Sequence, residues 1–190
     1  MKIGKLLATV VSLSQISSSV FANVIETDIC VYGDTAGGVA AAVQSSRMGK
    51  NVVLLAFGDH IGGMTSGGLG WTDYGNQNAI NGIAREFYQR IGQYYGMSIR
   101  WTFEPHIAEA VLKSMLNDAN VKVFYQQRLS SVNKNGKQIA EIVMENGDRY
   151  IAKVFIDATY EGDLMAMAGV SFTFGREGTN VYGESLNGIR

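Results

Sequence analysis

The sequence predicts an α/β domain in three layers: a parallel sheet, helices on one face and an antiparallel meander on the other. Two observations carry this prediction. A glycine-rich turn joins an apolar run to an alanine-rich segment and then to a second apolar run, and after about residue 120 the apolar residues alternate with a period of two. A chain of 190 residues suits one such domain.

The first half of the pattern is a strand, a helix and a second strand. Residues 27–32 are apolar and β-branched and end at Gly33, which predicts a buried strand. Residues 36–48 have a helical period and stop at Gly49, and residues 51–55 form the next apolar run. The two strands joined by this crossover helix are expected to be parallel.

The remaining elements follow from changes of period. Residues 58–81 form a glycine-rich loop that is too long for a simple connector, which indicates a functional segment. Asn-Gly pairs at 135–136 and 146–147 supply turns between the last three strands, which are therefore expected to form the meander. The predicted helices are 82–95, 105–116 and 161–168, and the predicted strands are 121–125, 129–132, 139–144 and 150–156.

The N-terminus has the pattern of a secretory signal. Lys2 and Lys5 precede an apolar stretch at 6–13, and small residues occupy the two positions that a signal peptidase reads in Val20-Phe21-Ala22. We predict a Sec-type signal peptide over residues 1–22, export to the periplasm or medium, and a domain over residues 23–190. The apolar stretch is too short for a membrane anchor.

Composition argues against several other classes. The formal net charge of -1 gives no electrostatic reason to expect nucleic acid or an anionic membrane as partner. Cys30 lies inside an apolar run, which favours a buried structural residue over a catalytic thiol. His60 and His106 have no spacing typical of a metal site, and we expect no metal.

The turn after the first strand, "GDTAGG", is a candidate pyrophosphate site. Gly33 permits the tight turn, Gly38 permits close packing of the helix on the strand, and the start of the helix offers free amides to an anion. Thr35 replaces the usual middle glycine, flanked by Ala36 and Gly37, and its hydroxyl could itself donate to a phosphate. A purely structural turn is the alternative.

The second strand lacks the acid expected after it. A carboxylate that binds the cofactor's ribose normally follows the glycine turn by about 20 residues. Ala56 stands there instead, while Asp59 lies three residues on and is either a substitute or a solvated turn residue. No arginine nearby suggests binding of a 2′-phosphate. This weakens an interpretation as an NAD(P)-dependent dehydrogenase, which stays as an alternative.

Two further stretches resemble motifs of FAD-dependent oxidoreductases. "HIGGMTSGGLGWTD" resembles the glycine doublet that passes beside the diphosphate and flavin, and "VFIDATYEGDLMAMAGV" resembles the later strand and turn near the diphosphate and ribitol. The candidate cofactor-binding residues that these motifs imply are Gly62, Gly63, Met64, Thr65, Ser66, Gly67, Asp157, Ala158, Thr159 and Asp163.

The order of motifs over residues 27–190 resembles a secreted FAD-dependent oxidoreductase family with the glutathione-reductase-like FAD/NAD(P)-binding fold, whose members are often labelled xanthan lyase-like. The resemblance implies FAD as cofactor and an unidentified small-molecule substrate. Members are normally longer, so the resemblance also implies an N-terminal portion, with a fold incomplete at its C-terminus. One half of a split flavoprotein, whose partner would be a missing C-terminal half, and a truncated non-catalytic remnant are therefore alternatives.

Overall fold

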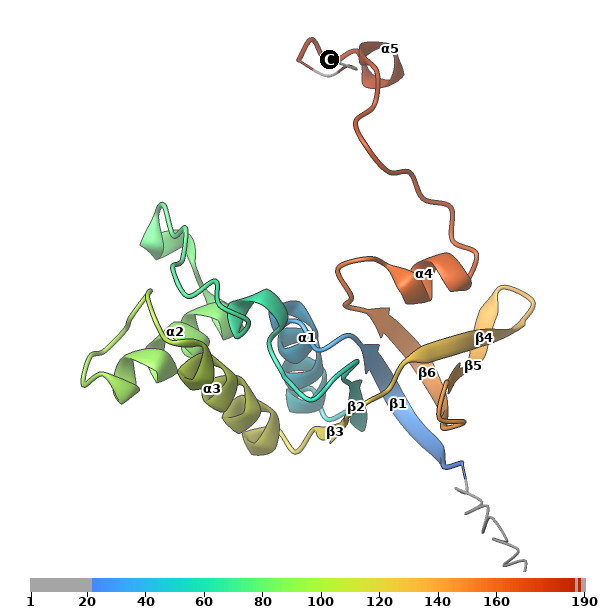
Figure 1. Cartoon of the computed structure of the whole chain (residues 1–190), viewed down its shortest axis with the longest axis horizontal. Helices are drawn as coiled ribbons and strands as arrows, with labels where there is room; N and C mark the ends of the chain where they lie inside the picture. The colour runs from blue at the N-terminus through green and yellow to red at the C-terminus, as the bar shows by residue number, and fades with distance from the viewer. Residues whose placement is uncertain (1–21, 187, 189–190) are drawn as a thin grey trace, which may run out of the picture.

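The computed structural model describes residues 22–186 and 188. These residues form one six-stranded sheet with the strand order β3-β2-β1-β6-β5-β4, flanked by helices (Figure 1). In chain order the elements are β1 (Val24–Tyr32), α1 (Ala36–Arg47), β2 (Val52–Leu55), the 3-10 turns η1 (Gly63–Thr65) and η2 (Gln77–Ala79), α2 (Gly82–Tyr94), α3 (Pro105–Asp118), β3 (Lys122–Phe124), β4 (Leu129–Asn135), β5 (Gln138–Met144), β6 (Arg149–Asp157), α4 (Asp163–Met167) and α5 (Thr179–Tyr182).

The pairing of the strands confirms a parallel sheet joined to an antiparallel meander. β1 pairs in parallel with β2 on one side and with β6 on the other, and β3 extends the parallel part beyond β2. β4, β5 and β6 pair antiparallel. β6 belongs to both parts, so the meander is continuous with the parallel sheet through hydrogen bonds. This pairing places Tyr32 beside Asp157, where both strands end.

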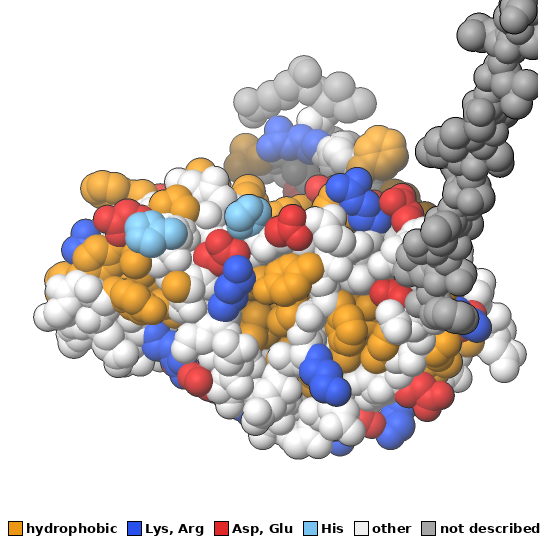
Figure 2. All heavy atoms as spheres, turned by 60° about the horizontal axis from the view of Figure 1, so that its bottom comes forward, with side chains coloured by type: hydrophobic (Ala, Val, Ile, Leu, Met, Phe, Trp, Pro, Cys, Tyr) orange, Lys and Arg blue, Asp and Glu red, His pale blue; other side chains and the backbone are white. Residues whose placement is uncertain are grey.

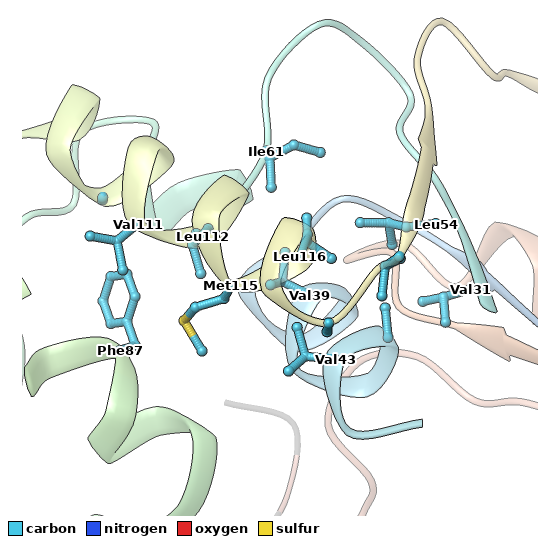
Figure 3. Packing of buried hydrophobic residues seen from close by; sticks show 14 of the residues in the cluster. Val31, Val39, Val43, Leu54, Ile61, Phe87, Val111, Leu112, Met115 and Leu116 are labelled. Atoms are coloured by element: carbon cyan, nitrogen blue, oxygen red, sulfur yellow. The ribbon is translucent and has the colours of Figure 1, made fainter. Parts of the chain in front are cut away.

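The helical face of the sheet holds the larger part of the core. Val31 and Leu54 point from the strands toward Val39 and Val43 of α1 (Figure 3). α3 adds a stripe that reaches Phe87 of α2, and all of these side chains are buried. The α3 stripe consists of Val111, Leu112, Met115 and Leu116.

The opposite face of the sheet packs against the meander and α4. Because successive side chains of a strand point to opposite faces, Cys30 and Tyr32 lie on this side while Val31 lies on the other. They share a buried cluster with Ile142 of β5 and Leu164 of α4. The domain therefore has the three layers expected from the sequence. Cys30 is fully buried and burial raises the pKa of its thiol, in agreement with a structural role.

Most predicted elements are present, with shifted ends. β1 begins at Val24, earlier than predicted, because its first residues pair with the start of β6. The last predicted helix begins only at Asp163, since Gly162 before it has a left-handed φ of 76°. The chain after α4 leaves the sheet and carries the short helix α5 (Figure 1). The predicted signal peptide, apart from Ala22, lies outside the described residues.

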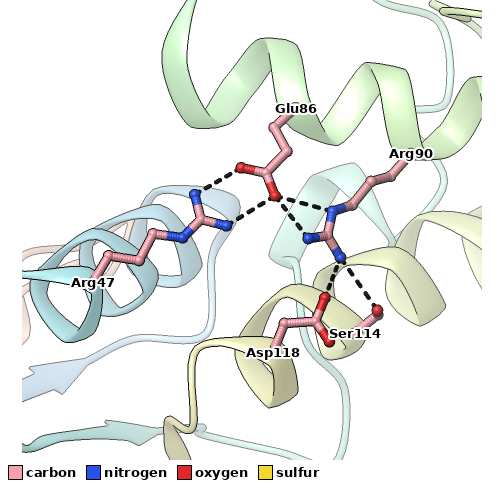
Figure 4. Close-up of polar contacts among 5 residues, drawn as sticks. All are labelled: Arg47, Glu86, Arg90, Ser114 and Asp118. Carbon is pink, nitrogen blue, oxygen red and sulfur yellow. Dashed lines mark hydrogen bonds and ion pairs between the residues drawn. The ribbon is translucent and has the colours of Figure 1, made fainter.

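An ion-pair network joins the helices α1, α2 and α3. Arg47 of α1 donates two hydrogen bonds to Glu86 of α2, at 2.7 and 2.8 Å (Figure 4). Arg90 bonds Glu86 at 3.0 Å and reaches Asp118 of α3 at 2.6 Å. Hydrogen bonding from Arg47, with a further bond from Arg90, holds the pKa of the Glu86 carboxyl below its usual range despite partial burial. The network fixes the helices against one another at the surface.

The surface is mixed in charge. On the face shown in Figure 2, basic and acidic side chains are interspersed among hydrophobic ones. Within residues 22–186 and 188, no helix is long and apolar enough to cross a bilayer.

Candidate functional site

Three segments that are far apart in the sequence meet where β1 and β6 end. They are the β1–α1 turn (33–38), the glycine doublet and the residues after it (62–67), and the turn after β6 (157–163). The first two are joined by the Gly62 amide, which donates to the Asp34 carbonyl at 2.6 Å. The Met64 amide donates to the Tyr160 hydroxyl at 2.8 Å and joins the second to the third. The fold thus brings together the three motifs that the sequence singled out.

Gly33 and Gly38 are required by close backbone contacts. Gly33 has a φ of +117°, and a Cβ there would lie 2.5 Å from the carbonyl carbon of Ala158. A Cβ on Gly38 would lie 2.0 Å from the Gly33 carbonyl oxygen. Neither position has room for a side chain, so these two glycines let the strand, the helix and the turn after β6 pack against each other.

Thr35 is the N-cap of α1. Its hydroxyl accepts a hydrogen bond from the Gly38 amide at 3.1 Å and donates to the Ala158 carbonyl at 2.8 Å. Since a hydroxyl has one proton, the bond to Ala158 uses the proton that the sequence analysis considered as a donor to a phosphate. The amides of Ala36 and Gly37 in the first turn have no intrahelical partner and are the anion-binding groups that this turn can offer.

The glycine doublet makes room for side chains of two other elements. Both glycines have left-handed φ values, +112° at Gly62 and +53° at Gly63. A Cβ on Gly62 would lie 2.5 Å from Leu112 Cδ1, and one on Gly63 would lie 2.4 Å from the Tyr160 hydroxyl oxygen. Ser66 donates to the Ile61 carbonyl at 2.6 Å and closes the short turn that follows.

Asp157 and Thr159 organise the turn after β6. Asp157 Oδ1 accepts from the amide and the hydroxyl of Thr159, at 3.0 and 2.7 Å, and Oδ2 accepts from the Met165 amide at 2.8 Å. The Thr159 hydroxyl in turn accepts from the Gly162 amide at 2.8 Å. Both oxygens of Asp157 are thus used inside the turn, whereas Asp163 in the first turn of α4 is exposed.

Two cavities open beside these segments. One cavity of about 390 Å³ lies at the end of β1, and the predicted site residues Gly33, Thr35, Thr159 and Asp163 help to line it. A second of about 230 Å³ is lined by the glycine-doublet segment through Gly63, Ser66 and Gly67. The other predicted site residues lie elsewhere. Ala36, Gly37 and Thr65 line a third cavity of about 290 Å³ between the helices, and Gly38, Gly62, Met64, Asp157 and Ala158 line none of the three.

Sequence reasoning missed some residues of the larger cavity. Asp34, Phe57 and Glu161 line it, and Asp34 also lines the second cavity. Asp34 lies inside the glycine turn, so its position in the sequence could have indicated that it lines the site. The dinucleotide-binding pattern specifies only the glycines of this turn. Phe57 follows Ala56 directly, and only the end of β2 in three dimensions shows that it reaches the cavity.

Ala56, which stands where a ribose-binding acid is expected after β2, lies in the protein interior. Ala56 is fully buried, its amide donates to the Phe124 carbonyl at 2.8 Å, and its carbonyl accepts from the Gln127 amide at 2.9 Å. Asp59 is exposed and lines neither cavity of the site, which favours a solvated turn residue. Across the part of the chain that the structure describes, no three His, Cys, Asp or Glu side chains gather in a way that could hold a metal ion.

Replacing Thr35 by Val tests its structural role. The variant keeps the shape and loses the hydroxyl, so we expect a loss of about 1–2 kcal/mol in the free energy of unfolding, because the helix cap and the bond to Ala158 both disappear. Urea denaturation measures this loss. Thr35→Ser keeps the hydroxyl and should stay within about 0.5 kcal/mol of the wild type. Equal stability of the Val and Ser variants would contradict the role of the hydroxyl.

Several solved structures have a similar fold, and one of them is a flavin-dependent enzyme. L-proline dehydrogenase from P. horikoshii aligns with a TM-score of 0.60 and 13% identity over 83% of this chain and 59% of its own. A flavin-dependent brominase gives 0.59 and 15% over 80% of this chain and 43% of its own. A geranylgeranyl bacteriochlorophyll reductase-like protein from Thermoplasma acidophilum gives 0.55 and 18%, covering 78% and 43%. At these identities the likeness concerns the fold, and the chain spans less than two thirds of each structure.

The family is identified by sequence. No curated protein matches the chain. The sequence profile of the family described as FAD dependent oxidoreductase matches residues 28–189, which include all three segments of the site. The chain therefore belongs to the FAD dependent oxidoreductase family.

Proposed function

We propose that residues 23–190 are the FAD-binding region of an exported flavin-dependent oxidoreductase that acts on a small molecule. The observation that carries the proposal is the meeting of three glycine-bearing or acidic segments at the carboxyl ends of β1 and β6, where open α/β folds bind their ligands. The cofactor of the family is FAD. When bound, FAD supplies hydride or electron transfer, and the protein supplies binding and orientation.

The first turn of α1 fits a diphosphate. Thr35 occupies the Gly38 amide, which leaves the amides of Ala36 and Gly37 at the positive end of the helix dipole. Gly37 is exposed, and a Cβ there would meet only the Thr35 hydroxyl, at 3.5 Å. The residues that line the larger cavity include no Lys or Arg, so backbone amides would be the main donors to the phosphates.

The glycine doublet would support the flavin side of the site. Gly63, Ser66 and Gly67 leave the backbone open to the second cavity. Tyr160 lies against Gly63, and its hydroxyl is held by the Met64 amide at 2.8 Å. Tyr160 is 54% exposed, so its ring presents an aromatic surface beside the doublet that a flat ligand can contact.

An NAD(P)-dependent dehydrogenase is less well supported. Such an enzyme needs a ribose acid after β2 or a cation for a 2′-phosphate. Ala56 is buried at the first position, and the cavity lining contains no cation for the second. A chain that folds without retaining flavin, whether a remnant or one half of a split flavoprotein, is the other outcome of the experiment below.

Flavin retention tests the proposal. Residues 23–190 are mixed with FAD and desalted, and the visible absorption spectrum is recorded. We expect flavin absorption to stay with the protein, because residues 23–190 contain the lining of both cavities and the first-turn amides that can bind the diphosphate. A folded protein, judged by circular dichroism, that comes off the column colourless would contradict the proposal.

A variant at Gly38 gives the matched comparison. Gly38→Ala places a Cβ 2.0 Å from the Gly33 carbonyl oxygen, which forces the β1–α1 turn apart. We expect flavin retention to fall at least tenfold, with a Tm several degrees lower. Gly37→Ala controls for helix propensity, since its Cβ meets no atom closer than 3.5 Å, and its Tm should not fall. Full retention by Gly38→Ala would remove the turn from the site.

Export rests on the N-terminal pattern and on one contact. The Asn23 amide nitrogen lies 2.9 Å from Oδ1 of Asp148, a carboxylate that is only 8% exposed. Cleavage after Ala22 would turn this nitrogen into an ammonium group beside a carboxylate, a stronger pair than the amide forms. We expect the protein recovered from the periplasm or medium of an expressing bacterium to have the intact mass of residues 23–190. A secreted or retained species with residues 1–22 still attached would contradict this.

A further inference from the structure

The site contains a carboxylate at the place where the family pattern lacks one. An acid at the end of the second strand normally binds the ribose of the dinucleotide. Here Ala56 is fully buried and both of its backbone groups are bonded inside the sheet, so nothing at that position can contact a ligand. Any ribose contact must come from another residue near the end of β2.

Asp34 lies at that place although it comes from the β1–α1 turn. Its carbonyl is fixed by the Gly62 amide at 2.6 Å, and its carboxyl faces the amides of Phe57 and Gly58, the two residues after Ala56. Burial raises the pKa of the Asp34 carboxyl, and hydrogen bonding by the amides of Asp34 itself, Gly58 and Phe57 offsets part of that effect. A carboxylate has about four acceptor positions, so these three amides leave Asp34 room for one further hydrogen bond at the mouth of the cavity.

We propose that the Asp34 carboxylate accepts a hydrogen bond from a hydroxyl of the adenosine ribose of FAD, in place of the acid that β2 lacks. The proposal rests on the proposed function. The position of Asp34 explains how one side chain can serve this role: it lines the larger cavity together with Phe57 and also borders the second cavity beside the glycine doublet.

The neighbouring groups favour Asp34 over the other acids. Asp163 and Glu161 also line the larger cavity, but both are exposed and come from the turn after β6. Phe57, half exposed, lines the same cavity beside Asp34, and the Arg128 guanidinium lies 4.4 Å from its ring centroid. The end of β2 thus combines an aromatic surface with a carboxylate, the pair of groups that a nucleoside needs for its base and its sugar.

A competing interpretation of Asp34 predicts the opposite change in nucleotide affinity when the carboxylate is neutralised. If the carboxylate only lies near the diphosphate, it repels the phosphates, and its neutralisation should tighten nucleotide binding. If it binds the ribose, neutralisation should weaken binding, and only for nucleotides that carry the ribose hydroxyls. The sign and the ribose dependence therefore separate the two interpretations.

Isothermal titration calorimetry with ADP and 2′,3′-dideoxyADP makes this test. Wild-type residues 23–190 are expected to bind ADP about tenfold more tightly than the dideoxy compound, as for one charge-assisted hydrogen bond. Asp34→Asn should reduce this preference to about twofold or less, while FAD retention falls. The control variant Asp59→Asn changes an acid in the loop after β2. It should keep the tenfold preference, because Asp59 lines neither cavity of the site.

A thermal unfolding measurement on Asp34→Asn excludes a merely structural role. The folded state holds the Asp34 proton more tightly than the unfolded state does, so stability from this group is present below the unfolded pKa and is lost as pH rises through the folded pKa. Asn removes the charge but keeps one side-chain oxygen that can accept from the Phe57 or Gly58 amide, so the Tm of the variant should not fall by more than a few degrees. A larger fall in Tm would indicate that Asp34 mainly supports the turn.

Each outcome decides something. Tighter ADP binding by Asp34→Asn, or an unchanged preference for the ribose hydroxyls, overturns the assignment of Asp34 and leaves the FAD-binding function standing if the wild type retains flavin. A wild-type protein that is folded and binds neither FAD nor ADP overturns both proposals.

Discussion

The site depends on the Thr35 hydroxyl, which is bonded to two segments at once. The hydroxyl accepts a hydrogen bond from the Gly38 amide in the first turn of α1, and it donates one to the Ala158 carbonyl after β6. The first bond sets where the helix begins, and the second sets how close the two strand ends lie. Because Thr35 is 7% exposed, water competes little for either bond. The hydroxyl therefore replaces the flexibility of a middle glycine with a fixed junction between β1 and β6.

Steric closeness completes that junction. The Gly33 and Gly38 backbones touch the turn after β6 and each other so closely that no Cβ fits at either position. The glycine doublet shows the same constraint with side chains as neighbours, since Leu112 and Tyr160 fill the space next to Gly62 and Gly63. The glycines of this chain thus have two uses: some let backbones meet, and others admit a side chain from another segment.

The electrostatic character of the site follows from its location in the sheet. Acidic side chains gather near the larger cavity, and its lining offers no Lys or Arg to balance them. Asp157 accepts three hydrogen bonds within the turn after β6 and lines neither cavity, whereas Asp34 lines both cavities and burial raises the pKa of its carboxyl. A half-buried carboxyl group that lines a cavity and has a shifted pKa is typical of a functional site. The stability of the domain comes from elsewhere, chiefly the two cores on either side of the sheet and the Arg47–Glu86–Arg90 network.

The sequence by itself determined the main helices and strands, their order and the three motifs, because these depend on local period, glycine placement and turn chemistry. It did not indicate the 3-10 turns η1 and η2 or the short helix α5. It also determined that Cys30 is buried, since the residue stands within an apolar run. Tertiary structure alone decided which polar groups remain free for a ligand. Thr35 and Asp157 are residue types that often bind ligands, but their hydrogen-bonding groups are used elsewhere. Thr35 donates to Ala158, which is distant in the sequence, and Asp157 accepts from the nearby Met165 amide. Asp34 has no motif to announce it and reaches the end of β2 only because β1 and β2 are adjacent in the sheet. Hydrogen-bond partners far apart in the chain are not encoded in local pattern, so the chemistry of the site became visible only once the strands were paired.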